Sequence, residues 1–108
     1  MLCAQFIFRP GSYDAEFHTL DDEIEAFAQS LDGYVGVDRW VSDDGASRNS
    51  IYYFRDRDAM NLLARYPSHL VAKREYARWY DGYQIVLSEV VGSYGDGRIE
   101  HPAASRQP

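Results

Sequence analysis

The 108-residue sequence has one cysteine, 4 prolines and no long apolar run. Because Cys3 has no second cysteine to pair with, an internal disulfide is excluded. A membrane-spanning helix needs about 20 consecutive apolar residues, and no stretch of the chain approaches that length. The opening segment MLCAQFIFRP lacks the basic start and the long apolar core of a secretory signal peptide. We therefore expect a protein of the reducing cytoplasm that does not enter a membrane.

Positive charge is also scarce, with 11 Lys and Arg against 17 Asp and Glu, for a net charge of -6. Proteins that bind nucleic acids or anionic membranes neutralise phosphates with Lys and Arg, so neither partner is expected. The acidic runs DDE and SDD lack the histidines and the carboxylate spacing of a metal site, and we expect no metal. A P-loop, a dinucleotide-binding fingerprint and a Ser-His-Asp order are missing too.

Apolar and aromatic residues, in contrast, are plentiful: 45% of the chain is hydrophobic and 15% is aromatic. Such a composition is typical of a folded protein, because a disordered chain is poor in aromatic residues. A chain of this length forms a single domain. The sequence thus predicts one compact domain with an unusual supply of tyrosine, 9 residues in all.

The pattern of apolar residues predicts strands alternating with amphipathic helices. Apolar side chains recur every three to four positions in the helical segments, and alternating, β-branched or aromatic residues mark the strands. Pro67 divides the second helical region, since proline lacks an N–H group and clashes with the preceding turn. The predicted elements are a strand over 2–8, a helix over 14–31, strands over 34–41 and 50–55, helical segments over 56–66 and 68–80, and a strand over 82–94.

This βαββαβ order predicts a ferredoxin-like α+β sandwich, with both helical regions on one face of a four-stranded antiparallel sheet. The domain spans residues 1–94, and residues 95–108 are predicted to form a C-terminal arm or a disordered tail. The second face of the sheet is left uncovered and carries apolar side chains such as Trp40 and Tyr53. We expect this face to pack against a second copy, which gives a homodimer.

Several segments resemble the antibiotic biosynthesis monooxygenase (ABM) family of dimeric α/β barrels. The resemblance covers about residues 2–94 and is carried by FIFRPGSYDAEF, LDGYVGVDRWVSDDG, YYFRDRDAMNLLARYPSHLVAK and GYQIVLSEVVGSYG. It implies a dimeric α/β barrel and an oxidative function. The family includes cofactor-independent monooxygenases that act on aromatic polyketides, and haem-degrading enzymes.

The chain departs from both groups at the residues that carry their chemistry. The quinone-forming members use an asparagine, a tryptophan and a tyrosine at positions that match Ser50, Phe54 and Met60 here. The haem-degrading members use a tryptophan and an iron-binding histidine, where this chain has Leu63 and Lys73. Lysine rarely ligates haem iron because it must first lose its proton, so haem binding is disfavoured and no cofactor is expected.

The segment after Pro67 supplies the candidate catalytic residue. If residues 69–80 form one helix, a turn of about 100° per residue places His69, Tyr76, Trp79 and Tyr80 on one side. Histidine has an ordinary pKa of about 6.5 and is the best proton-transfer group in the chain. Aromatic rings with polar tips suit a pocket for a planar aromatic ligand.

Strand alternation adds two more residues to this candidate site. In the strand over 50–55, Tyr52 and Phe54 share one face, which we expect to point toward the helices and the cavity beside His69. The predicted site therefore has His69 as the catalytic residue and binds substrate through Tyr52, Phe54, Tyr76, Trp79 and Tyr80.

A structural role for the same residues is the alternative. The rings of Tyr76, Trp79 and Tyr80 then pack in the core, and His69 bonds a backbone carbonyl near the bend at Pro67. Surface positions are expected for the two other histidines, His18 and His101. Cys3 is expected to be a small buried apolar residue.

Two functions follow from these features. The first is a cofactor-independent monooxygenase that oxidises a small aromatic or phenolic substrate, with His69 taking or positioning the proton. The second is a non-catalytic dimeric protein that binds a small molecule in the same aromatic cavity. Oxygen consumption with a bound aromatic compound separates the two.

Overall fold

The computed structural model describes residues 1–104, and the predicted ferredoxin-like α+β fold is confirmed. In chain order the elements are β1 (Leu2–Pro10), α1 (Ala15–Ser30), β2 (Tyr34–Val41), β3 (Arg48–Phe54), α2 (Arg57–Ala64), α3 (Pro67–Arg74), the 3-10 turn η1 (Tyr76–Arg78) and β4 (Tyr80–Glu89). Within this described range, no helix is long and apolar enough to cross a membrane.

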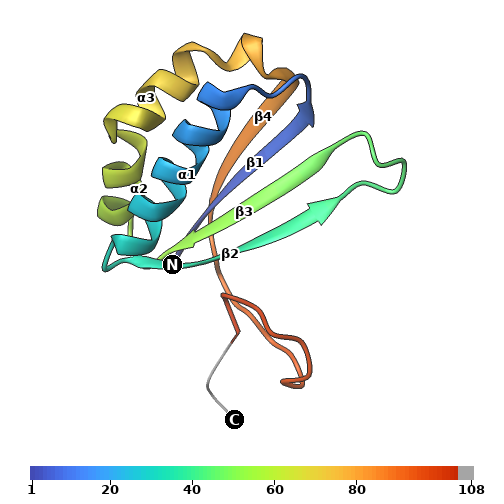
Figure 1. Ribbon diagram of the computed structural model, residues 1–108. Helices are drawn as coiled ribbons and strands as arrows, with labels where there is room; N and C mark the ends of the chain where they lie inside the picture. The colour runs from blue at the N-terminus through green and yellow to red at the C-terminus, as the bar shows by residue number, and fades with distance from the viewer. Residues whose placement is uncertain (105–108) are drawn as a thin grey trace.

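The strands form one antiparallel sheet in the order β2-β3-β1-β4, and the helices lie together on one side of it (Figure 1). Register fixes which residues share a face, because paired residues in an antiparallel sheet point the same way. Ala4 of β1 pairs with Tyr52 of β3 and with Leu87 of β4. Ala4 and Tyr52 both pack against the core under the helices, so alternate residues of β3 from Arg48 to Phe54 face the helices.

The core lies between α1, α2 and β3. Its buried residues are Ala28, Phe54, Ala59 and Leu63, and Phe54 is only 1% exposed. Gly33 lets α2 approach the start of β2, since a Cβ on this residue would lie 2.4 Å from the Cβ of Ala59. Burial of apolar surface here is the main force that holds the helices on the sheet.

The predicted helix over 68–80 is wrong in its second half, because α3 ends at Arg74. The chain then makes one 3-10 turn and enters the sheet. The N–H of Gly11 donates to the carbonyl of Trp79 at 2.8 Å, and Tyr80 pairs with Pro10. Pairing with β1 therefore determines the conformation of the chain at Trp79 and Tyr80, although the spacing of the side chains there also suits a helix.

The strand predicted over 82–94 also has other bounds: β4 begins at Tyr80 and ends at Glu89. Its partner β1 begins at Leu2, which pairs with Glu89. Beyond that pair, one further bond among residues 1–104 continues the ladder, from the N–H of Val90 to the carbonyl of Met1 at 3.0 Å. The strand ends where its partner ends.

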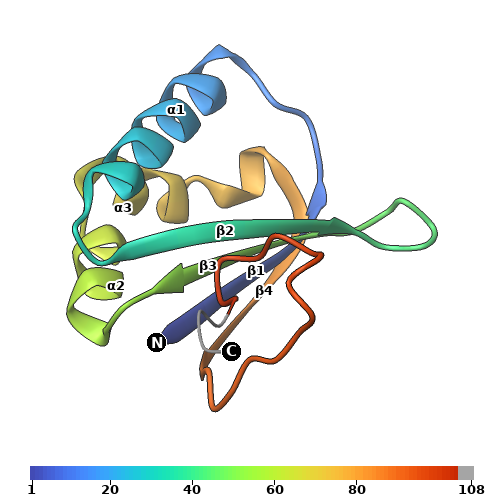
Figure 2. The same cartoon turned by 90° about the horizontal axis from the view of Figure 1, so that it is seen from below.

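The segment after β4 returns across the sheet face opposite the helices (Figure 2). Ala103 is buried against Cys3 and Tyr53, and Pro102 lies over Gly36. The face predicted to be uncovered is thus partly covered by the chain's own tail, although Trp40 remains 63% exposed. Residues 105–108 of the predicted tail lie outside the described residues.

Candidate functional site

Tyr52 lies at the centre of the helix-facing side of the sheet. It belongs to β3, pairs with Val37 of β2 and Ala4 of β1, and is half-buried. Burial raises the pKa of its phenol, and the nearby charge of Glu25 acts in the same direction. The charge and hydrogen bonding of Arg39 oppose this rise. Tyr52 therefore presents a protonated hydroxyl at neutral pH.

Tyr80, the first residue of β4, lies inside a cluster of aromatic rings. Its ring makes edge contacts with four others at centroid distances of 5.2 to 5.9 Å. We call this set the aromatic cluster: Phe6, Phe8, Tyr13, Phe17 and Tyr80. Tyr13 and Phe17 are stacked with centroids 4.0 Å apart and planes 4° from parallel. The cluster joins β1, β4, α1 and the loop before α1, and offers flat ring surfaces and edges that a planar ligand can stack against.

Burial and nearby charges both act on the phenol of Tyr80. Burial raises the pKa of its phenol strongly, and the charges of Tyr13, Asp21 and Tyr52 raise it further. These four side chains therefore lie close enough to interact, although they come from β4, the loop before α1, α1 and β3. Their phenols stay protonated and can donate hydrogen bonds to a ligand oxygen.

Asp21 and Glu25 are four residues apart on α1 and so lie on one side of the helix. Partial burial raises the pKa of Asp21, followed by the like charges of Glu25 and Asp22. Glu25 is paired with Arg39 of β2, with Oε2 and Nη2 3.3 Å apart. We call Tyr13, Asp21, Arg39, Tyr52 and Tyr80 the tyrosine site.

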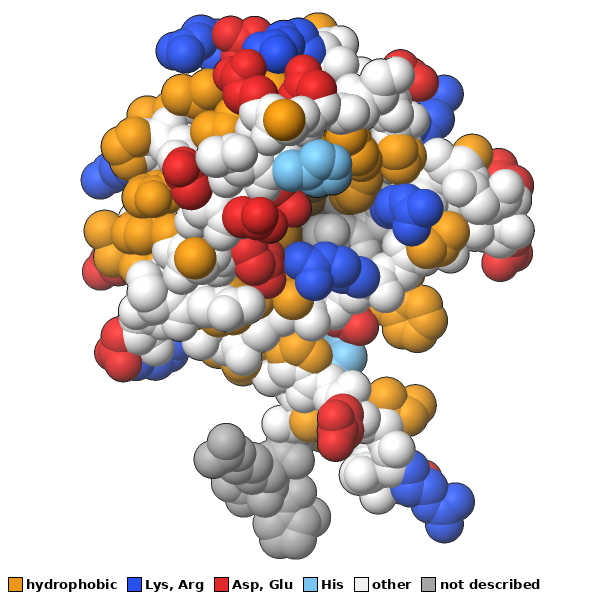
Figure 3. Space-filling view, in the orientation of Figure 1, with side chains coloured by type: hydrophobic (Ala, Val, Ile, Leu, Met, Phe, Trp, Pro, Cys, Tyr) orange, Lys and Arg blue, Asp and Glu red, His pale blue; other side chains and the backbone are white. Residues whose placement is uncertain are grey.

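Figure 3 shows a recess in the surface beside α1, bordered by a histidine and by cationic side chains. The tyrosine site is on this helix-covered side of the sheet. In the described part of the chain, no group of three His, Cys, Asp or Glu residues is placed to hold a metal ion.

His69 lies at the junction of α2 and α3. Its Nδ1 is 3.4 Å from the carbonyl oxygen of Ala64, the last residue of α2. Because a carbonyl only accepts, Nδ1 carries the proton in this contact and the neutral ring keeps its lone pair on Nε2. Burial lowers the pKa of His69, so the imidazole is neutral at pH 7. Within residues 1–104, no hydrogen bond or ring contact joins His69 to the five aromatic residues predicted to bind substrate.

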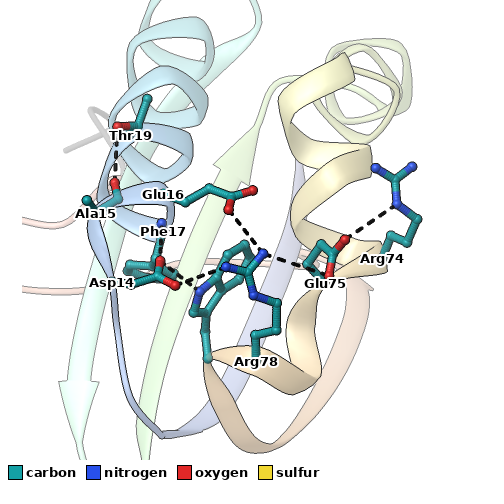
Figure 4. A network of polar contacts seen from close by, with 9 residues as sticks. Asp14, Ala15, Glu16, Phe17, Thr19, Arg74, Glu75 and Arg78 are labelled. Carbon is teal, nitrogen blue, oxygen red and sulfur yellow. Dashed lines mark hydrogen bonds and ion pairs between the residues drawn. The ribbon is translucent and has the colours of Figure 1, made fainter.

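Trp79 is 1% exposed and forms part of the packing beneath α1. Its ring meets Phe17 at a centroid distance of 5.5 Å, and its Nε1 donates to Oδ1 of Asp14 at 3.1 Å. Figure 4 shows Arg78 beside this pair, in contact with Asp14 and Glu16. The indole has no free surface to offer a ligand.

Tyr76 and Phe54 occupy different surroundings again. Tyr76 is 41% exposed and packs edge-on against Tyr83, while Phe54 is enclosed in the core. Among the predicted site residues, Tyr52 and Tyr80 lie on the same, helix-covered side of the sheet. Phe54 packs with Tyr52 and Trp79 directly precedes Tyr80, but both side chains are buried. Among the described residues, no hydrogen bond or ring contact joins His69 or Tyr76 to either tyrosine.

Several residues of the tyrosine site were missed from the sequence. Arg39 pairs with Ser50 and faces the helices, which strand alternation extended to the neighbouring strand predicts. Tyr13 lies in a loop, one residue before the Asp14 that caps α1, and no periodic pattern marks it. Asp21 had a helical signal, because Leu20 and Ile24 beside it belong to the apolar stripe.

Comparison with solved structures finds the same fold in several proteins, among them an antibiotic biosynthesis monooxygenase. The protein Rv0793 from Mycobacterium tuberculosis matches with a TM-score of 0.70 and 16% identity, over 87% of this chain and 98% of that one. SnoaB, a cofactor-independent oxygenase from Streptomyces nogalater, matches with a TM-score of 0.66 and 18% identity, over 85% and 94%. A structure described as an antibiotic biosynthesis monooxygenase matches with a TM-score of 0.62 and 14% identity, over 85% and 100%.

These matches confirm the ABM-like fold that the sequence resemblance predicts. At such low identity they establish the fold alone. No family model matches the chain, and no curated protein matches it.

Proposed function

We propose that the protein is a cofactor-independent monooxygenase of the ABM type that oxidises a small aromatic or phenolic substrate. The observation that carries this proposal is the aromatic cluster around Tyr80, which lies on the same side of the sheet as Tyr52. Two phenols held in their protonated form next to flat apolar rings suit a planar, oxygen-bearing ligand. The shared fold with SnoaB, a cofactor-independent oxygenase, supports the same reaction class.

The reaction needs an electron-rich substrate that loses a proton. The resulting carbanion or its phenolate form reduces O₂, one C–O bond forms, and the proton returns to give a hydroperoxide. Where that carbon keeps a hydrogen, the hydroperoxide loses water and leaves a ketone. Hydrogen bonds from Tyr52 and Tyr80 to the substrate oxygen stabilise the anion, and the aromatic cluster excludes water from it.

His69 remains our proposal for the group that takes or positions the proton. With Nδ1 directed at the carbonyl of Ala64, Nε2 is the atom able to accept it. The lowered pKa of His69, caused mainly by burial, favours the neutral base at pH 7. In this proposal Phe54 and Trp79 act on the substrate indirectly, by holding Tyr52 and Tyr80 in place, and Tyr76 offers an exposed ring.

We also propose that the active form is a homodimer that pairs the sheet faces opposite the helices. Large apolar side chains on this face remain exposed, among them Trp40 at 63% and Val86 at 39%. Exposed apolar side chains gathered on one face are typical of an interaction surface.

Oxygen consumption by the purified protein tests the proposal. A panel of hydroxylated two- and three-ring aromatic compounds is offered without added cofactor, and uptake above the uncatalysed rate is expected for at least one. The Tyr52→Phe variant keeps the ring and loses the hydroxyl, so we expect it to bind that compound and to oxidise it at least about tenfold more slowly. Asn61→Ala on α2 is the matched control and should oxidise at the wild-type rate.

The second candidate function is a non-catalytic dimeric protein that binds an aromatic molecule. The same aromatic cluster favours it, since stacking needs no catalytic group. Saturable binding of several panel compounds, with no oxygen uptake for any of them, would replace the monooxygenase by this function. Absence of a Soret band on addition of haemin is expected in either case.

A further inference from the structure

Two arginines project from neighbouring strands on the side of the sheet that faces the helices. Arg39 of β2 pairs with Ser50 of β3, and Arg48 of β3 pairs with Val41 of β2. Arg48 is two residues before Ser50 and therefore shares its face. The two arginines are diagonal neighbours across the strand pair, a relationship in which long side chains reach each other.

The two guanidinium groups differ in how their charge is balanced. Arg39 has Glu25 of α1 at 3.3 Å. Arg48 has no carboxylate within 4.0 Å among residues 1–104. The side chain of Arg48 is exposed, so a ligand carboxylate can reach its guanidinium.

Strand pairing places Arg48 beside the aromatic cluster, because Arg48 of β3 pairs with Phe8 of β1. Partial burial raises the pKa of the Tyr13 phenol, and the charge of Arg48 opposes that rise. Arg48 therefore acts on the loop that carries Tyr13, and Tyr13 is stacked on Phe17. Arg48 and the rings of the aromatic cluster therefore border the same part of the molecule.

We propose that Arg48, with Arg39 and Ser50, binds a carboxylate carried by the aromatic ligand of the tyrosine site. Guanidinium matches carboxylate in geometry and forms paired hydrogen bonds with it, and a buried hydroxyl such as that of Ser50 donates a further one. The ring of the ligand then lies on the aromatic cluster. The ligand class is an aromatic carboxylic acid, which is narrower than the neutral phenols that the proposed function alone admits.

This inference rests on the proposed location of the site and does not depend on oxidation. The acidic groups of the tyrosine site fit the same assignment: Glu25 holds Arg39 in place, and Asp21 is on α1, across from the strands that carry the two arginines. A positively charged ligand would have to displace Arg39 from Glu25 and would meet Arg48.

The test compares salicylate with salicylamide, which has the same ring and hydroxyl but a neutral amide. Binding to the full-length protein is measured by isothermal titration calorimetry without turnover. We expect salicylate to bind about tenfold tighter or more, as a charge-assisted hydrogen-bonded pair requires. Arg48→Gln should remove this preference and leave salicylamide binding unchanged, and Arg39→Gln should reduce it.

Arg57→Gln on α2 is the matched control, because Arg57 is also an exposed arginine but follows the Asp56 cap on α2, outside the strands that carry Arg39 and Arg48. Circular dichroism of each variant confirms that it is folded. Equal affinity of the two probes, or an undiminished preference in folded Arg48→Gln, overturns the proposal. If the protein prefers the carboxylate but consumes oxygen with no compound, this inference stands and the monooxygenase proposal is overturned. If it oxidises neutral phenols without preferring the carboxylate, the monooxygenase proposal stands and this inference is overturned.

Discussion

The indole Nε1 of Trp79 donates a hydrogen bond of 3.1 Å to Oδ1 of Asp14, the residue that caps the N-terminus of α1. The same oxygen accepts the N–H of Phe17 at 2.9 Å. Trp79 directly precedes Tyr80, so this contact ties the start of β4 to the start of α1. The position of Tyr80 in the aromatic cluster therefore depends on a side chain that has no exposed surface of its own.

Two substitutions of Trp79 should destabilise the fold to different extents. Trp79→Phe keeps most of the ring and loses the indole donor, and should lower the free energy of unfolding by about 1–2 kcal/mol. Trp79→Ala also leaves a cavity and should lower it by about 3–5 kcal/mol. Urea unfolding followed by circular dichroism measures both. Trp40→Phe, at an exposed tryptophan, is the control and should change the free energy of unfolding by less than about 1 kcal/mol. If Trp40→Phe lost as much stability as Trp79→Phe, burial of Trp79 would not be the cause.

The order of elements could be predicted because each has a strong local signal. Asp14 and Asp56 stand immediately before periodic apolar segments, and both cap helices as such residues do. The segment from Tyr76 to Tyr80 was mispredicted because its side chains also suit a helix. Its conformation is decided by pairing with Gly11 and Pro10, which lie more than sixty residues earlier in the chain.

The same tertiary effect limited the prediction of the site. Tyr52 follows from strand alternation, which is a local rule. Tyr80 was selected for a helical face that does not exist, and it reaches the site through β4 instead. Asp21, Arg39 and Tyr13 approach these phenols only when α1 is placed on the sheet, and one sequence holds no local signal for that placement.

Asp56 should make the fold sensitive to acid. Its Oδ1 accepts the N–H of Ala59 at 2.9 Å, and this bond, assisted by Arg55, holds the pKa of the carboxyl below its ordinary value. A lowered folded-state pKa contributes stability that is present above the unfolded-state pKa and is lost as pH falls through the folded-state pKa. Asp56→Ala should thus lower the melting temperature at pH 7, and the gap to wild type should narrow between about pH 4 and pH 2.

Thermal unfolding by circular dichroism across that pH range measures the effect of Asp56→Ala. Asp43→Ala, in the exposed turn between β2 and β3, is the control and should follow wild type at each pH. If the difference in melting temperature between Asp56→Ala and wild type stays constant down to pH 2, the charge of Asp56 does not stabilise the helix cap.

His69 can be tested with two amides that mimic its two nitrogens. Asn places its amide near the position of Nδ1 and can keep the bond to the carbonyl of Ala64, while Gln reaches toward Nε2. If Nε2 transfers the proton, His69→Asn should retain stability within about 1 kcal/mol and lose about a hundredfold or more of kcat. Full activity in stable His69→Asn assigns His69 a structural role.

The pH profile of the wild-type enzyme gives a second, independent measurement of His69. A base with a pKa lowered by burial remains unprotonated below the ordinary histidine value of about 6.5. The acidic limb of kcat/KM should therefore fall below pH 6.5 and be missing in His69→Asn. A limb at or above pH 6.5, or one retained in the variant, points to another group.

The sheet face opposite the helices should carry the dimer contact. Trp40 pairs with Asn49, and Val86 pairs with Gln5, so both project from the face that also holds Tyr53. A stable interface buries about 800 Å² on each partner, and a single buried carboxylate without a partner is costly in it. Trp40→Glu and Val86→Glu should convert a dimer into monomers in light scattering after size exclusion. Leu62→Glu, at an exposed apolar residue of α2, should leave the dimer intact, and dissociation by this control alone would place the interface on the helices.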